Sequence, residues 1–105
     1  IIVEGSPKQV TEAINDMVQE KQRLGFRTAV IATEETKGDY VCDIICSIGS
    51  RQCEGSIAAG LYDILREMDR LEAEYIYAES FEDDRLGQAI MNRMLKAAGY
   101  HLMKV

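Results

Sequence analysis

The feature that most constrains the fold is a regular alternation of short apolar segments with helical patterns. Five segments are apolar almost throughout, namely residues 1–3, 28–32, 43–48, 75–79 and 101–105. An uninterrupted apolar run of this length is typical of a strand that is buried on both of its faces. We therefore expect these five segments to be the strands of one sheet.

Helical patterns fill the intervals between the expected strands. Apolar residues recur at helical spacing over residues 7–24, 52–71 and 85–98, and residues 33–36 begin a short helical turn that Gly38 closes. Strands that alternate with helices pair in parallel. The sequence predicts a three-layer, Rossmann-like α/β domain with a five-stranded, mainly parallel sheet and helices on both faces. The strand order 3-2-1-4-5 is favoured over 2-1-3-4-5.

The first helix carries a clear start signal. Ser6 precedes Pro7, the only proline of the chain, and Gln9 follows three residues after Ser6. Proline suits the first helical position, and a serine with a glutamine three residues later can form a capping box. We expect this helix to begin at Pro7 and to end before Gly25.

Length and charge limit the classes of function. The chain has 105 residues, which is room for a single domain over residues 1–105. Twelve Lys and Arg residues against 18 Asp and Glu residues give a net charge of −6. Because phosphate backbones are bound mainly by Lys and Arg, we expect no direct nucleic-acid binding. No apolar run approaches the roughly 20 residues of a membrane helix, so we expect no membrane partner and a cytoplasmic location.

Three cysteines, Cys42, Cys46 and Cys53, lie close together without a C-x-x-C pair, and His101 is the only histidine. We expect reduced thiols that pack as small apolar side chains, and no metal site. The sequence also lacks the glycine-rich dinucleotide fingerprint, the phosphate loop and the G-x-S-x-G elbow. We therefore expect no catalytic residue in this domain, and we interpret His101 as a structural or surface residue.

Ligands of open parallel sheets bind beyond the carboxyl ends of the strands. The polar residues expected there are Ser6, Thr33, Glu34, Ser50, Arg51, Glu79 and Ser80. One interpretation makes them helix caps and turn residues, which belong at such positions for structural reasons. The other makes them a polar crevice for a small anion or a peptide segment.

The last predicted helix has a polar stripe that includes Asn92. Arg93 falls on the side that carries Ile90 and Ala97, so we expect its guanidinium to face the sheet. An internal ion pair with Glu34 or Glu79 is favoured over a contact with another domain. Asn92 is the better candidate for a contact outside the domain.

Several stretches together resemble a known family. They are residues 3–6, 32–36, 47–51, 61–66 with Asp69, and above all 86–98, Leu-Gly-Gln-Ala-Ile-Met-Asn-Arg-Met-Leu-Lys-Ala-Ala. In this order they resemble the C-terminal accessory domain of the long, two-domain form of L-threonylcarbamoyladenylate synthase, of the YrdC/Sua type. The resemblance covers nearly the whole chain. The opening at Ile1 rather than Met likewise leads us to expect an excised or trimmed piece of a longer protein.

The resemblance implies a parent enzyme that joins threonine, bicarbonate and ATP into threonylcarbamoyl-AMP for the threonylcarbamoyladenosine modification of tRNA. It implies that ATP, with Mg, and threonine bind in a separate N-terminal YrdC-like domain, which a linker joins to this one. The expected partners of this chain are that domain and that linker, and no cofactor is expected here. The resemblance favours a regulatory role, and the alternatives are a self-standing nucleotide- or anion-binding module and an oligomerisation domain.

Overall fold

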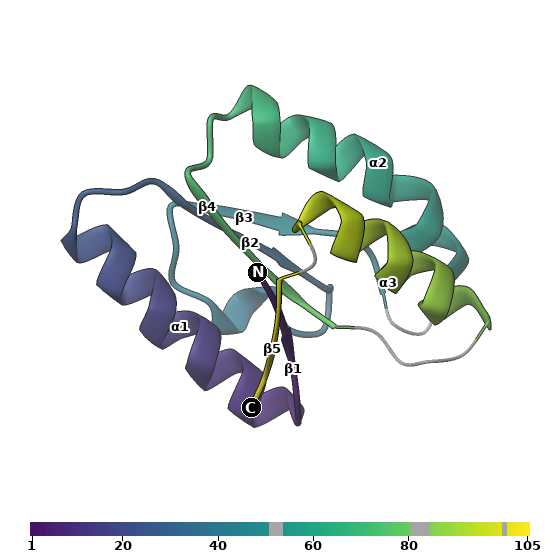
Figure 1. Ribbon diagram of the computed structural model, residues 1–105, viewed down its shortest axis with the longest axis horizontal. Helices are drawn as coiled ribbons and strands as arrows, with labels where there is room; N and C mark the ends of the chain where they lie inside the picture. The colour runs from purple at the N-terminus through teal and green to yellow at the C-terminus, as the bar shows by residue number, and fades with distance from the viewer. Residues whose placement is uncertain (51–53, 81–84, 100) are drawn as a thin grey trace.

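The computed structural model describes residues 1–50, 54–80, 85–99 and 101–105 (Figure 1). In chain order the elements are β1 (Ile2–Glu4), α1 (Pro7–Arg23), β2 (Thr28–Ala32), the 3₁₀ helix η1 (Lys37–Asp39), β3 (Ile44–Ser47), α2 (Glu54–Arg70), β4 (Tyr75–Glu79), α3 (Arg85–Ala97) and β5 (Leu102–Lys104). All five expected strands and all three expected helices are present. The expected short helical turn is present: the Thr33 carbonyl accepts from the N–H groups of Thr36 and Lys37, and the 3₁₀ helix η1 follows from Lys37 to Asp39.

The five strands form one sheet in the order β3-β2-β4-β1-β5. Every neighbouring pair is parallel, with Val30 opposite Tyr77 and Ile2 opposite Ala78. The parallel α/β class is thus confirmed, but both expected strand orders are wrong. The connection from β1 through α1 skips one position before the chain enters β2, and β4 later fills the vacant place.

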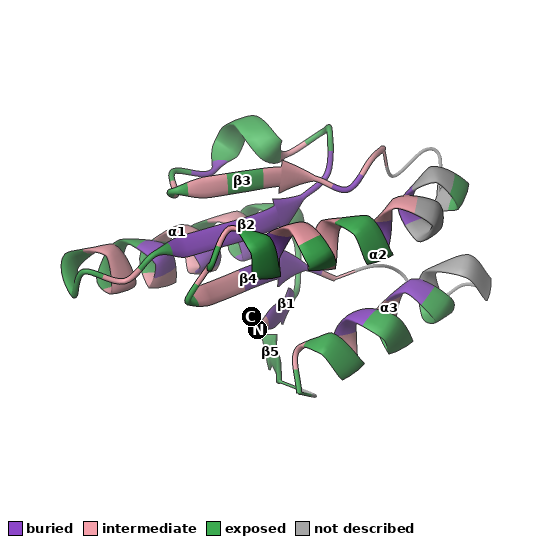
Figure 2. Cartoon of the chain, turned by 90° about the horizontal axis from the view of Figure 1, so that it is seen from above, coloured by how far each residue is buried: buried purple, intermediate pink, exposed green. Residues whose placement is uncertain are grey.

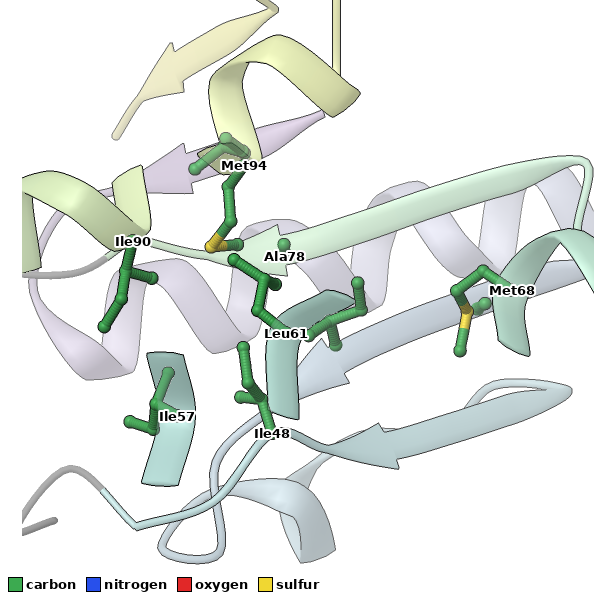
Figure 3. Close-up of a cluster of buried hydrophobic side chains, with 10 residues drawn as sticks. Ile48, Ile57, Leu61, Met68, Ala78, Ile90 and Met94 are labelled. Atoms are coloured by element: carbon green, nitrogen blue, oxygen red, sulfur yellow. The ribbon is translucent and has the colours of Figure 1, made fainter. Parts of the chain in front are cut away.

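Helix α1 covers one face of the sheet and α2 and α3 cover the other (Figures 1 and 2), and an apolar cluster lies on each face. On one face α1 packs against β1, β2 and β4 through Val10, Ile14 and Val18. On the other face α2 and α3 pack against each other and against the sheet. Met94 of α3 points toward Leu61 of α2 in this second cluster (Figure 3). The expected three layers are therefore confirmed.

The start of α1 matches its sequence signal. The Ser6 hydroxyl donates to Oε1 of Gln9 over 2.9 Å, and Ser6 Oγ accepts a long bond, 3.4 Å, from the Gln9 backbone N–H. Pro7 occupies the first turn, where its missing N–H has no partner to lose. After Leu24 the chain turns at Gly25, whose φ of +89° lies in the region that favours glycine.

A side chain at the opposite, amino end of the sheet joins β2 to the entry of β3. One carboxylate oxygen of Asp43 accepts from the Thr28 N–H at 2.9 Å and from its hydroxyl at 3.2 Å. These bonds, led by the one from the backbone N–H, lower the pKa of Asp43 below its usual value. The bonds fix where the edge strand β3 begins, and with it the register of β3 on β2.

Candidate functional site at the carboxyl edge of the sheet

On each side of β4, the path of the chain creates a place where a groove could form at the carboxyl ends of the strands. After β1 and β2 the chain leaves toward the face that α1 covers. After β4, which lies between them, it leaves toward α3 on the other face (Figure 1). Connections that diverge from neighbouring strands mark the switch points where open α/β sheets bind ligands. The gaps between β2 and β4 and between β4 and β1 are therefore where a site should be sought.

Glu79, the last residue of β4, lies at the centre of this edge and is buried, with 4% of its surface exposed. Its carboxyl oxygen accepts a 2.5 Å hydrogen bond from the hydroxyl of Tyr40, which follows η1. Burial and this hydrogen bond raise the pKa of Tyr40 above its usual value. The side chain that sequence analysis placed at the edge is thus turned inward, onto the α1 side of the sheet.

Thr33 and Glu34 follow β2. Thr33 is fully buried, and its hydroxyl and backbone N–H both contact the hydroxyl of Thr36, at 3.0 and 3.3 Å. Glu34 is exposed and pairs with Lys37 over 2.9 Å. Hydrogen bonding from Ser47, followed by that from Lys37, lowers the pKa of Glu34. These contacts shape the turn into η1.

The ends of β2 and β3 are tied together. The Glu34 N–H donates to the carbonyl of Gly49 over 2.9 Å, and the Ser50 hydroxyl donates to Glu35 over 3.0 Å. Glu34 and Ser50 are therefore close in space, as expected. Arg51, the other residue predicted for this place, lies outside the described residues.

Ser6 lies beyond β1 and caps α1, as the structural interpretation had it. The neighbouring Gly5 is packed tightly against the end of β5. A Cβ at Gly5 would lie 2.7 Å from Cγ2 of Val105 and 2.8 Å from its carbonyl oxygen. Val105, the residue after β5, therefore occupies the space beside Gly5 at the β1 end of the edge.

Asn92 and Arg93 are both exposed on α3, and the expectation that Arg93 faces the sheet is wrong. Ile90 and Met94 are buried, and the partly buried residues next to them are Met91, Leu95 and Ala98. The buried stripe is therefore rotated away from Arg93 and Ala97. The favoured ion pair with Glu34 or Glu79 does not fit this placement, since Glu34 pairs with Lys37 and Glu79 lies under Tyr40.

The polar side chains at the carboxyl edge form hydrogen bonds within the domain. In the described part of the chain, every buried side-chain nitrogen or oxygen has a hydrogen-bond partner. Within the same residues, no three His, Cys, Asp or Glu side chains are grouped to hold a metal ion. Cys42 and Cys46 are half-buried free thiols whose pKa values are raised by burial, and Cys53 lies outside the described residues.

No described helix is long and apolar enough to cross a membrane.

Sequence analysis missed Tyr40, the partner of Glu79. The two residues are 39 positions apart, and no local pattern connects them. It also missed Asn15 of α1, whose amide donates to the carbonyl of Asp39 over 2.9 Å and accepts from the N–H of Val41 over 3.2 Å. The only hint in the sequence was that a polar residue, Asn15, stands next to the apolar positions of α1.

Comparison with known proteins agrees with this architecture. A family model described as the C-terminal domain of threonylcarbamoyl-AMP synthase matches residues 1–99. The threonylcarbamoyl-AMP synthase of Bacillus subtilis is 46% identical over 103 residues, which are 98% of this chain and 29% of that protein. This chain therefore spans less than a third of that relative.

Solved structures show the same fold. A double variant of Sua5 from Pyrococcus abyssi aligns with a TM-score of 0.88 at 35% identity, over 99% of this chain and 28% of that one. The C-terminal Sua5 domain from Pyrococcus horikoshii aligns with a TM-score of 0.76 at 32% identity, over 99% of this chain and 93% of that one. The chain thus belongs to the family of threonylcarbamoyl-AMP synthase C-terminal domains.

Proposed function

We propose that this chain is a non-catalytic accessory domain of an enzyme that makes threonylcarbamoyl-AMP from threonine, bicarbonate and ATP for tRNA modification. In this role it docks on the N-terminal catalytic domain and on the linker between the two. The observation that carries the proposal is the engagement of the carboxyl edge in structural contacts. Ser6 caps a helix, Thr33 bonds to Thr36, and Glu79 is held under Tyr40.

ATP does not fit the described residues of this edge. Glu34 and Glu35 lie beside the ends of β2 and β3, where acidic side chains oppose a triphosphate. The sequence has no phosphate loop, and the turn after β1 begins α1 with a proline. We therefore assign ATP and Mg to the N-terminal domain, and derive no chemical step within this one.

Asn92 and Arg93 are our candidates for the contact with the rest of the enzyme. Both are exposed on α3, in the stretch that most resembles the family. In the free domain an exposed guanidinium remains hydrated, so the domain bears no desolvation cost for it. The same guanidinium can bind a carboxylate of another domain. Weaker candidates for this role are Ser6, Glu34 and Ser50, because their side chains already make structural contacts within the domain.

The test compares three preparations of the two-domain enzyme: the intact protein, the protein without this domain, and the shortened protein with the 105-residue chain added back. Threonine-dependent pyrophosphate release and threonylcarbamoyl-AMP formation are measured in each. We expect a loss of product on deletion, partial recovery on addition, and no product from the 105-residue chain alone. Full activity after deletion would contradict the accessory role. Calorimetric binding of ATP to the 105-residue chain would instead support a nucleotide-binding module.

A further inference from the structure

A small apolar cavity lies on the sheet face covered by α2 and α3, near the amino end of β1. It measures about 70 Å³ and is partly open. Its wall comes from β1, β2, β4, α2 and α3 and from the adjoining residues Ile1 and Ala98, and it includes Ile2, Ile76 and Met94. Roughly 10–15 Å³ suffices for one water molecule by this measure, so there is room for an apolar side chain. With an almost wholly apolar lining, the cavity offers water few partners.

The backbone at Ile1 already has the hydrogen bonds of a continuing strand. The amino group of Ile1 donates to the carbonyl of Ile76 over 2.9 Å, and the carbonyl of Ile1 accepts from the Ala78 N–H over 3.0 Å. The first of these bonds is one that a peptide N–H makes equally well. The ladder between β1 and β4 therefore accepts a peptide bond before Ile1.

The alternation of side chains along a strand fixes where the preceding residue points. Ile1 packs against the cluster on the α1 side, and Ile2 belongs to the cluster on the α2 and α3 side. Successive side chains of a strand point to opposite faces. The residue before Ile1 therefore points to the same face as Ile2, where the cavity lies.

We propose that, in the longer protein, the residue before Ile1 is apolar and fills the cavity between α2, α3 and the sheet, so that the linker enters as an extension of β1. The family model describes a C-terminal domain, and the B. subtilis relative is far longer than the matched segment. The inference rests on the proposed function only for the existence of a preceding linker. It anchors that linker to the two helices of one face.

The test uses two extended forms of the 105-residue chain, which carry Ser-Leu or Leu-Ser before Ile1. They have the same composition, but only Ser-Leu places leucine on the cavity face. We expect the thermal midpoint of the Ser-Leu form to exceed that of the Leu-Ser form by about 4 °C or more, the shift typical of a well-buried apolar side chain in a domain of this size. Nuclear Overhauser contacts between the leucine methyls and Ala98 should appear in the Ser-Leu form alone.

A substitution that fills the cavity from Ala98, the residue directly after α3, provides the control. Ala98→Leu should abolish the advantage of Ser-Leu over Leu-Ser, whereas Ala89→Leu, on the exposed side of the same helix, should preserve it. Equal midpoints for the two extended chains, or an advantage that survives Ala98→Leu, would overturn the inference. Because neither chain contains a catalytic domain, that failure would leave the proposed accessory role untouched.

Discussion

The hydroxyl of Tyr40 donates to the buried carboxyl group of Glu79 and thereby joins the segment after η1 to the end of the central strand β4. The bond therefore links the two segments whose paths diverge at the carboxyl edge, the one that follows β2 and the one that follows β4. Both side chains are buried, so neither partner can be replaced readily by water.

Removal of the Tyr40 hydroxyl should therefore destabilise the domain. Tyr40→Phe leaves the buried Glu79 without this donor, and we expect the free energy of unfolding to fall by about 1–3 kcal/mol. Urea denaturation measures the change. Tyr62→Phe is the matched control, because Tyr62 is 56% exposed, and it should change stability by less than about 0.5 kcal/mol.

Stability should also fall in alkaline solution, through the same residue. The pKa of Tyr40 is raised above its ordinary value of 10.0, so the folded state keeps a proton that the unfolded chain loses. The contribution is therefore complete below about pH 10 and is lost as the pH rises further. Thermal midpoints between pH 8 and 11 should decline more steeply for the original chain than for Tyr40→Phe. Identical slopes would contradict the assignment.

Asp43 should have the opposite pH dependence. Its pKa is lowered, chiefly by the Thr28 N–H, so it stabilises the fold above its ordinary value of 3.8 and loses that effect as the pH falls. Asp43→Asn should lower the thermal midpoint at pH 7, and the difference should shrink in acid. Asp39→Asn is the control, since the hydrogen bonds of Asp39 with Asn15 and Thr36 use its backbone.

Gly5 should not tolerate a side chain. In Gly5→Ala the new Cβ meets Val105, including its backbone oxygen, and the end of β5 must move. We expect a loss of about 1–3 kcal/mol, the usual cost of overpacking. Gly38→Ala meets no atom within 4 Å and should be nearly neutral, so equal effects of the two substitutions would refute the packing argument.

Arg93→Ala and Asn92→Ala should separate stability from activity. Both residues are exposed, so each variant of the 105-residue chain should unfold within about 0.5 kcal/mol of the original. In the two-domain enzyme, product formation should decrease if these side chains contact the catalytic domain. Lys8→Ala, an exposed cation on α1 at the other face of the sheet, serves as the control. Normal activity of both α3 variants would remove the proposed contact.

Local signals were strong enough to predict the elements. The Ser6 cap, the apolar period of α1 and the continuous run of β2 each act within a few residues, and the structure confirms them. The strand order was not predictable in the same way. It depends on which crossover skips a position, and β1 and β4 are paired by residues as far apart as Ile2 and Ala78.

The placement of Arg93 failed for a related reason. The apolar residues of α3 allow more than one centre for the buried stripe, and a sequence period alone does not choose between them. Packing against α2 and the sheet selected the stripe through Ile90 and Met94, with Met91 and Leu95 on its flank. The Tyr40–Glu79 bond was unpredictable because it joins segments that meet only after the sheet has formed.

The central position of β4 has a consequence for the folding of the chain during its synthesis on the ribosome. The β1 and β2 strands are separated by the gap that β4 fills, so the first half of the chain emerges with its two inner strands unpaired to each other. Pairing of Ile2 with Ala78 requires closure of a long loop, which slows folding. The nascent chain can pair β2 with β3 earlier, but its sheet is complete only after β4 has left the exit tunnel, and until then the unpaired apolar strand β1 depends on protection from aggregation.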